Sequence, residues 1–191
     1  FAPQSPYARW QQHSLNGQIF SKLAQPYHSD AFPVGAGLVC GIAGFWSSRF
    51  PENELQATAI RMADCLRHRG PDDSGAWSDP DTGFSVAHRR LSVIDLSARS
   101  NQPLVDDELG LVLVFNGTIY NYPELREQLA SRGYHFFTGG DSEVILKAYA
   151  QWGEECPQHL HGMFAFAIWD IRRQTLFMAR DRFGIKPLYY S

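Results

Sequence analysis

The chain has 191 residues, of which 44% are hydrophobic and 14% aromatic, so it can bury one ordinary core. Its 17 basic and 20 acidic residues are interspersed and give a formal net charge of −3, which excludes a basic block that follows a nucleic-acid backbone or an anionic membrane surface. No apolar stretch approaches the roughly 20 residues that span a bilayer. Three cysteines without C-x-x-C spacing argue against a disulfide framework and a zinc site. We expect a cytoplasmic chain without a bound metal, whose partners are small molecules or proteins.

The first 39 residues differ in texture from the rest of the chain. They contain only three charged side chains and show no period of 2 or 3.6 residues. They also lack the basic head and the apolar core of a signal peptide. We expect residues 1–39 to be a disordered or loosely attached extension and residues 40–191 to form the folded domain.

The first half of this domain combines short apolar runs with one helical pattern. Pro51 and the two glutamates that follow it predict a helix N-terminus, and the helix is expected to bury Cys65 and to end before the turn at 69–71. The continuous apolar run at 111–115 is typical of a strand covered on both faces. Other extended segments are predicted at 42–46, 84–87 and 91–94.

The second half predicts two helices and a hairpin. One helix starts at Tyr122 and ends at Gly133, a strand is predicted at 134–137, and a second helix covers 142–152. Two apolar runs, 163–169 and 175–179, are joined by a polar link that predicts a hairpin. The last residues lie within another apolar stretch, so we expect the sequence to be a fragment.

Cys40 and the pair Asn116-Gly117 are candidates for acyl-transfer chemistry. Cys40 stands before a glycine-flanked strand, where it is either a buried structural thiol or a nucleophile that a substrate can approach. Asn-Gly is a strong hairpin signal. The alternative is that the Asn116 amide and the Gly117 N–H serve together as two donors to a tetrahedral oxyanion. The residues alone leave both choices open.

Arg90 and Asp141 are candidates for binding a free amino acid. A guanidinium offers a fork of donors to a carboxylate, although Arg90 could equally be a surface-paired arginine. Asp141 follows two glycines and precedes a helix, so it is either a helix cap or a partner for a substrate ammonium group.

Seven strings in order connect these candidates. Together they resemble the glutaminase domain of the glutamine-dependent asparagine synthetases, over essentially the whole chain from Cys40 onward: CGIAGFW, RHRGPDDSG, AHRRLSVID, FNGTIYN, TGGDSEVIL, GMFAFAIWD and RDRFGIKPLYY. The resemblance implies a class II glutamine amidotransferase domain with an α+β fold. That fold is the four-layer αββα sandwich of N-terminal-nucleophile hydrolases, in which two antiparallel sheets lie between helical layers.

The resemblance also assigns roles to residues. Cys40 is implied as the nucleophile with its own α-amino group as the base, and Asn116 and Gly117 as the oxyanion hole. Arg90 is implied to hold the glutamine carboxylate and Asp141 its ammonium group. The resemblance further implies that Leu91, Val93 and Ile94 line the pocket.

Two features depart from the family pattern. The family's usual N-G-E-I-Y-N has Thr118 in place of the glutamate, so we expect weaker contact with the substrate ammonium group. In addition, Cys40 follows Val39, and an amide nitrogen cannot accept the thiol proton. We therefore expect no efficient glutaminase activity until Cys40 is N-terminal.

Three explanations of the extension are open. We favour Val39 as a GUG initiator that is read as methionine and removed, which makes the upstream residues a mistaken extension. The others are a true propeptide and a retained extension on an inactive domain.

The expected function is hydrolysis of L-glutamine to glutamate and ammonia for a C-terminal synthetase domain of the same polypeptide. The resemblance implies ATP and magnesium for that second domain and no cofactor for this one. A non-catalytic regulatory or docking domain and a different N-terminal-nucleophile amidohydrolase are the alternatives. The sequence leaves open the acceptor, which could be aspartate or another carboxylate, and the oligomeric state.

Overall fold

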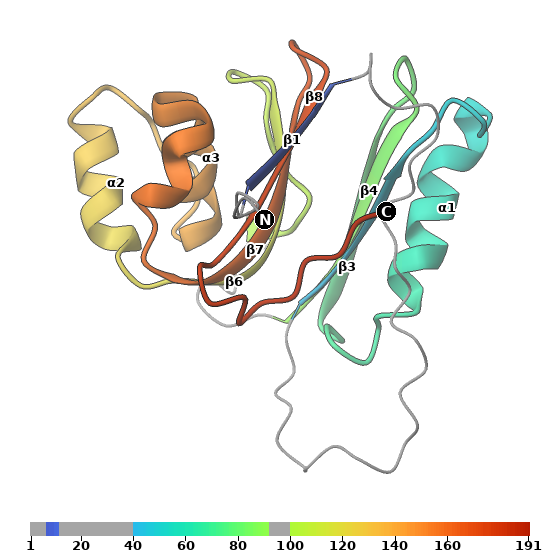
Figure 1. Cartoon of the computed structure of the whole chain (residues 1–191), viewed down its shortest axis with the longest axis horizontal. Coiled ribbons are helices and arrows are strands. Elements are labelled where there is room, and N and C mark those ends of the chain that lie inside the picture. Colours follow the sequence, from blue (N-terminus) through green and yellow to red (C-terminus); the bar gives the residue numbers. More distant parts are fainter. Residues whose placement is uncertain (1–6, 12–39, 92–99) are drawn as a thin grey trace, which may run out of the picture.

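The structure is a computed structural model, and it describes residues 7–11, 40–91 and 100–191. Two antiparallel sheets pack face to face, with α2 (Tyr122–Ala130) and α3 (Asp141–Trp152) outside the larger sheet and α1 (Glu52–Asp64) outside the smaller one (Figure 1). This four-layer arrangement confirms the predicted α+β sandwich. In the described part of the chain, no helix combines the length and apolar character needed to cross a bilayer.

The larger sheet has five strands. Their order is β1 (Tyr7–Gln11), β8 (Thr175–Arg180), β7 (Gly162–Asp170), β6 (Leu111–Ile119) and β5 (Leu104–Asp106). Strands β7 and β8 form the predicted hairpin, in which Asp170 is paired with Thr175. Strand β1 lies within the extension and pairs antiparallel with β8. The expected separation into an extension and a domain from residue 40 stays a prediction.

The smaller sheet has three strands in the order β2 (Gly41–Trp46), β4 (Phe84–Arg90) and β3 (Asp73–Asp79). Strand β4 is the central strand and is longer than the segment predicted at 84–87. Helix α1 packs on the outer face because Leu55, Ala59 and Ala63, spaced four residues apart, form a buried stripe.

Alternation along the strands builds the core between the sheets. The inward side chains include Trp46 and Phe84 from the smaller sheet and Trp169 from the larger one. The ring of Trp169 stacks on Phe84 at 4.4 Å between centroids and meets Trp46 edge-on at 4.8 Å. These aromatic contacts fix the distance between the sheets at this end of the sandwich.

Two expectations were wrong. Residues 134–137 do not form a strand, because the Tyr134 N–H donates to Leu129 at the end of α2 and the Phe137 N–H donates to the Glu143 carboxylate. Cys65 is exposed, since it caps α1 outside the buried stripe of that helix.

Candidate functional site

Cys40 lies directly before β2, at one end of the smaller sheet. The next residue, Gly41, pairs with Arg89, so Cys40 is level with the end of β4. The half-buried thiol contacts the backbone of Leu91: the Leu91 N–H donates to Sγ at 3.3 Å, and the thiol contacts the Leu91 carbonyl at 3.6 Å. Leu91 is therefore beside Cys40, while its role in lining a substrate pocket stays a prediction; Val93 and Ile94 lie outside the described residues.

The period of the strands directs three predicted site residues toward the space between the sheets. Cys40 continues the inward series of β2, Arg90 that of β4, and Asn116 that of β6; their inward neighbours include Ile42 and Trp46, Phe84 and Val86, and Val112 and Val114. Arg90 and Asn116 are both buried. The sandwich thus brings residues that are far apart in sequence to its inner faces.

Asn116 and Gly117 lie inside β6 and not in a turn, so the hairpin interpretation of this pair is wrong. They pair with Ala165 and Phe164 of β7. Gly117 has φ 154°, and a Cβ there would lie 2.1 Å from the Met163 carbonyl oxygen. Only glycine permits this close approach of β7.

Beyond Leu113, the edge of β6 that faces away from β7 is no longer paired with β5. Strand β5 pairs only with residues Leu111–Leu113. Farther along this edge, the Phe115 N–H donates to the Gln102 side chain at 2.6 Å and the Ile119 N–H donates to Asp141 Oδ2 at 2.9 Å.

Peptide groups of a strand alternate between its two edges. Even-numbered positions of this ladder bond toward β7, as the Tyr120 N–H does to the His161 carbonyl at 2.7 Å. The Gly117 N–H therefore lies on the edge free of β5, between the occupied donors of Phe115 and Ile119. A backbone donor in this position is what an oxyanion hole needs.

Asp141 begins α3 and connects it to this free edge. Its carboxyl group is buried, and burial raises its pKa above the ordinary value of 3.8, while hydrogen bonds from the backbone N–H groups of Ile119, Asp141 and Ser142 oppose that rise. Asp141 is thus a helix-start residue whose carboxylate faces β6.

The thiol of Cys40 lies within electrostatic reach of both predicted charged residues. Burial is the largest influence on Cys40 and raises its pKa. The Leu91 backbone hydrogen bond and the Arg90 charge act in the opposite direction, whereas the Asp141 charge raises the pKa further. Arg90 and Asp141 therefore have opposite effects on the pKa of the Cys40 thiol.

Arg90 is oriented by two residues to which the sequence assigned no role. Its guanidinium donates to the Asn101 side-chain oxygen, and the Asn101 amide donates to the Asp73 carboxylate. Asp73 faces Arg90 across the β3–β4 ladder. Asp73 belongs to the string RHRGPDDSG, which was the only signal for this chain of contacts.

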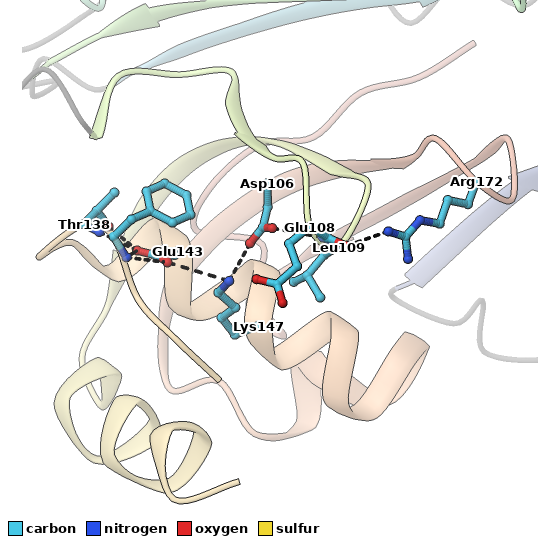
Figure 2. Close-up of polar contacts among 8 residues, drawn as sticks. Asp106, Glu108, Leu109, Thr138, Glu143, Lys147 and Arg172 are labelled. Atoms are coloured by element: carbon cyan, nitrogen blue, oxygen red, sulfur yellow. Dashed lines mark hydrogen bonds and ion pairs between the residues drawn. The ribbon is translucent and has the colours of Figure 1, made fainter. Parts of the chain in front are cut away.

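A buried charge network, also missed from sequence, supports the segment before Asp141 (Figure 2). The Glu143 carboxylate accepts hydrogen bonds from the Thr138 N–H at 2.7 Å, the Thr138 hydroxyl at 2.8 Å and the Phe137 N–H at 3.0 Å. Lys147 lies 3.9 Å from Glu143 and 2.5 Å from Asp106. Glutamate at this place in a first helical turn is an ordinary capping signal, but its burial with Lys147 could not be read from the pattern.

Thr118 is half-buried in β6, opposite Met163. It has the same inward parity as Asn116, two residues before it. It thus lies near the predicted oxyanion residues, where its hydroxyl supplies no negative charge. Over residues 7–11, 40–91 and 100–191, no group of three or more His, Cys, Asp or Glu side chains could hold a metal ion.

The αββα sandwich has the layer order expected for an N-terminal-nucleophile hydrolase, and Cys40 lies directly before the first strand of its smaller sheet. Residues 39–191 match the family described as the glutamine amidotransferase domain. The chain belongs to this family, which supports glutamine hydrolysis as the activity of the domain.

Curated relatives carry related names. The chain is 41% identical over 155 residues to asparagine synthetase [glutamine-hydrolyzing] 3 of Bacillus subtilis, covering 80% of this chain and 25% of the relative. It is 48% identical over 164 residues to a putative asparagine synthetase [glutamine-hydrolyzing] of Mycobacterium tuberculosis H37Rv, covering 81% and 25%. For asparagine synthetase B [glutamine-hydrolyzing] of Escherichia coli K12, the values are 40% over 151 residues, 79% and 26%. The chain thus spans about a quarter of the length of these relatives.

A likeness among solved structures is to the glutamine phosphoribosylpyrophosphate amidotransferase of B. subtilis complexed with ADP and GMP. It has a TM-score of 0.40 and 18% identity, and it covers 58% of this chain and 31% of that one.

Proposed function

We propose that this domain hydrolyses L-glutamine to glutamate and ammonia with Cys40 as the nucleophile. The observations that carry the proposal are the β2–β4 register, which sets Cys40 level with Arg90, and the hydrogen bond of Asp141 to the β6 edge that holds the Gly117 N–H. Hydrolysis of the side-chain amide of a free amino acid requires four groups. They are a cation for the carboxylate, an anion for the ammonium group, a nucleophilic thiol and a donor to the oxyanion.

The resemblance to the family assigns the roles, and the charges of the residues support them. Arg90 binds the glutamine α-carboxylate, because its guanidinium stays charged and is already oriented by Asn101. Asp141 binds the α-ammonium group, whose positive charge favours the ionised carboxylate. Leu91, which lies beside Cys40, contacts the aliphatic part of the substrate.

The reaction has two steps. The Cys40 thiolate attacks the side-chain amide carbon, and the resulting oxyanion accepts hydrogen bonds from the Asn116 amide and the Gly117 N–H. Ammonia leaves with a proton, and water then hydrolyses the thioester to glutamate. Each oxyanion donor of this kind is worth about 2.7 to 4 kcal/mol of barrier.

The thiol needs a base because burial raises its pKa. A free α-amino group with a pKa of about 7.7 to 8.0 can accept the proton at neutral pH. The amide nitrogen between Val39 and Cys40 cannot. Activity therefore requires release of Cys40 as the first residue.

The deciding experiment frees Cys40 in an otherwise intact protein. A recognition site for a protease that accepts cysteine after the cut is placed before Cys40, and ammonia release from glutamine is measured before and after cleavage. We expect activity only after cleavage, with none from a cleaved Cys40→Ala control. A folded, cleaved protein that binds glutamine without releasing ammonia would favour a non-catalytic regulatory or docking domain, which Thr118 and the blocked Cys40 keep under consideration.

We further propose that the ammonia serves a synthetase domain of the same polypeptide. The relatives' names and their greater length support this proposal. ATP and magnesium would act in that second domain, and aspartate is the acceptor that the names favour. A cytoplasmic location also stays a prediction.

A further inference from the structure

We propose that His88 and Gln102 are positioning residues that hold the β6 segment around Phe115 so that the Asn116 and Gly117 donors face the substrate. This inference rests on the proposed glutaminase function. It concerns two buried side chains to which neither the sequence motifs nor the proposed mechanism assigns a role.

Both side chains bind one residue of β6. The Phe115 N–H donates to Gln102 Oε1 at 2.6 Å, and the Phe115 carbonyl lies 3.1 Å from His88 Nε2. Strand β5 ends its pairing at Leu113, so these two contacts replace the strand partner that Phe115 lacks on this edge. At Phe115, hydrogen bonds with two side chains thus take the place of the backbone pairing that a longer β5 would have provided.

The His88 contact connects the two sheets beside the candidate site. His88 belongs to β4, two residues before Arg90, and Phe115 directly precedes Asn116 in β6. The Phe115 carbonyl and the Asn116 nitrogen belong to one planar peptide group. A hydrogen bond to that carbonyl therefore fixes the orientation of the peptide that leads into the oxyanion pair.

The protonation of His88 suits a permanent donor. A carbonyl can only accept a hydrogen bond, so Nε2 carries the proton. Burial lowers the pKa of His88 to about 4, with Arg90 lowering it further and the Phe115 contact and Asp73 opposing this, so the ring is neutral at pH 7. Nδ1 is buried and has no hydrogen-bond partner among the described residues, which leaves the Phe115 contact as the polar interaction of the ring.

The tests change each of the two side chains that contact Phe115. At each position, one variant removes the hydrogen bond and a second variant restores it. His88→Met and Gln102→Met lose the hydrogen bonds at similar volume, whereas His88→Gln keeps a donor and Gln102→Glu keeps an acceptor. Val86→Ala is the matched control, because Val86 is a buried inward residue of the same strand as His88. Thermal unfolding ranks the stability loss of all five variants.

The kinetic readout uses protein with Cys40 freed by cleavage. We expect the two methionine variants to lose about 10- to 100-fold in kcat, while KM for glutamine changes less than about threefold. The reason is that the oxyanion donors are misplaced, whereas Arg90 and Asp141 still bind the substrate. His88→Gln and Gln102→Glu should recover most of the rate. Equal losses in Val86→Ala, or unchanged kcat in both methionine variants, would overturn the proposal.

A second readout does not depend on activity. Amide hydrogen exchange is measured on the full chain, and we expect the backbone of residues 115–119 to exchange at least about tenfold faster in each methionine variant than in Val86→Ala. If wild type proves inactive, the proposed function fails while exchange still tests the positioning. Unchanged exchange at 115–119 in Gln102→Met would refute the positioning role even if the His88 variants do not fold.

Discussion

The Asp141 carboxylate and the Ile119 N–H are joined by a 2.9 Å hydrogen bond between the start of α3 and the free edge of β6. This contact sets a proposed substrate-binding charge beside the strand that carries the proposed oxyanion donors. It also fixes α3 against the sheet through a group that burial makes harder to ionise.

Asp141→Asn should change both the pH dependence of stability and the KM for glutamine. Burial, the largest cause, raises the folded-state pKa of Asp141 above its ordinary 3.8, so the folded state takes up a proton before the unfolded state does. This group therefore adds stability as pH falls from neutral toward 4 and loses it as pH rises. Urea unfolding between pH 7 and 4.5 should show the wild type gaining relative to Asp141→Asn, while KM for glutamine is higher in the variant. A difference in stability that does not change with pH would contradict this assignment.

The reactivity of Cys40 should respond in opposite directions to its two charged neighbours. Arg90 lowers and Asp141 raises the pKa of the thiol, in addition to the larger effect of burial. At pH 8 we expect slower alkylation by iodoacetamide in Arg90→Gln and faster alkylation in Asp141→Asn. Peptide mass spectrometry follows Cys40, and exposed Cys65 provides the internal reference. Parallel changes at both cysteines would indicate a general structural effect.

Gly117→Ala should be poorly tolerated. The added Cβ would lie 2.1 Å from the Met163 oxygen and 2.7 Å from the Phe164 Cα, so β6 and β7 would have to separate. We expect a loss of about 3 kcal/mol or more in urea unfolding. Gly133→Ala is the control, since Gly133 has φ 94° but a Cβ added there would meet no atom within 4 Å, and it should cost about 1 to 2 kcal/mol. Equal costs would show that close packing on β7 is not the constraint.

Lys147→Met should be much more damaging than loss of a surface charge. Asp106 and Glu143 are both buried, and the substitution removes the cation that lies against both carboxyl groups. We expect a loss of about 3 to 5 kcal/mol in the free energy of unfolding. Arg173→Met removes a partner of Asp170 at 3.6 Å, but Arg173 is 67% exposed, so its cost should stay below about 1 kcal/mol. A similar cost for both would contradict a structural role of the buried network.

Thr118→Glu should strengthen glutamine binding, because a carboxylate here adds a second negative group for the substrate ammonium. A charge-assisted hydrogen bond of about 1.5 kcal/mol corresponds to roughly a tenfold lower KM. Thr118→Gln has the length of glutamate without its charge and is the matched control. If both variants have the KM of the wild type, the idea of a missing anchor is wrong.

Local patterns predicted those elements whose partners lie nearby. The hairpin of β7 and β8 and helix α3 were foreseen because their periodicity and boundaries are local signals. Strands β3 and β5 were not foreseen. Strand β5 has only three residues, and β3 contains Ser74 and Gly75, so neither carries a strong apolar pattern.

The candidate site was foreseen as a set of residues and not as an arrangement. The motif strings named Cys40, Arg90 and Asp141, but their placement relative to one another depends on how the two sheets face each other. The contacts of Gln102 and His88 with Phe115 depend on where β5 stops pairing, and no local pattern marks that point. Long-range register, which local propensity does not determine, decides these interactions.

The segment before Cys40 also contributes to the larger sheet, because its strand β1 pairs with β8. Strand β1 is the outer strand of the five-stranded sheet, so it covers backbone groups of β8 that could otherwise pair with another chain. A cut before Cys40 creates the free amine and also turns β1 into part of a separate peptide. If that peptide dissociates, β8 becomes an open edge, so the cleavage that the proposed mechanism requires would also remove a protection against self-association.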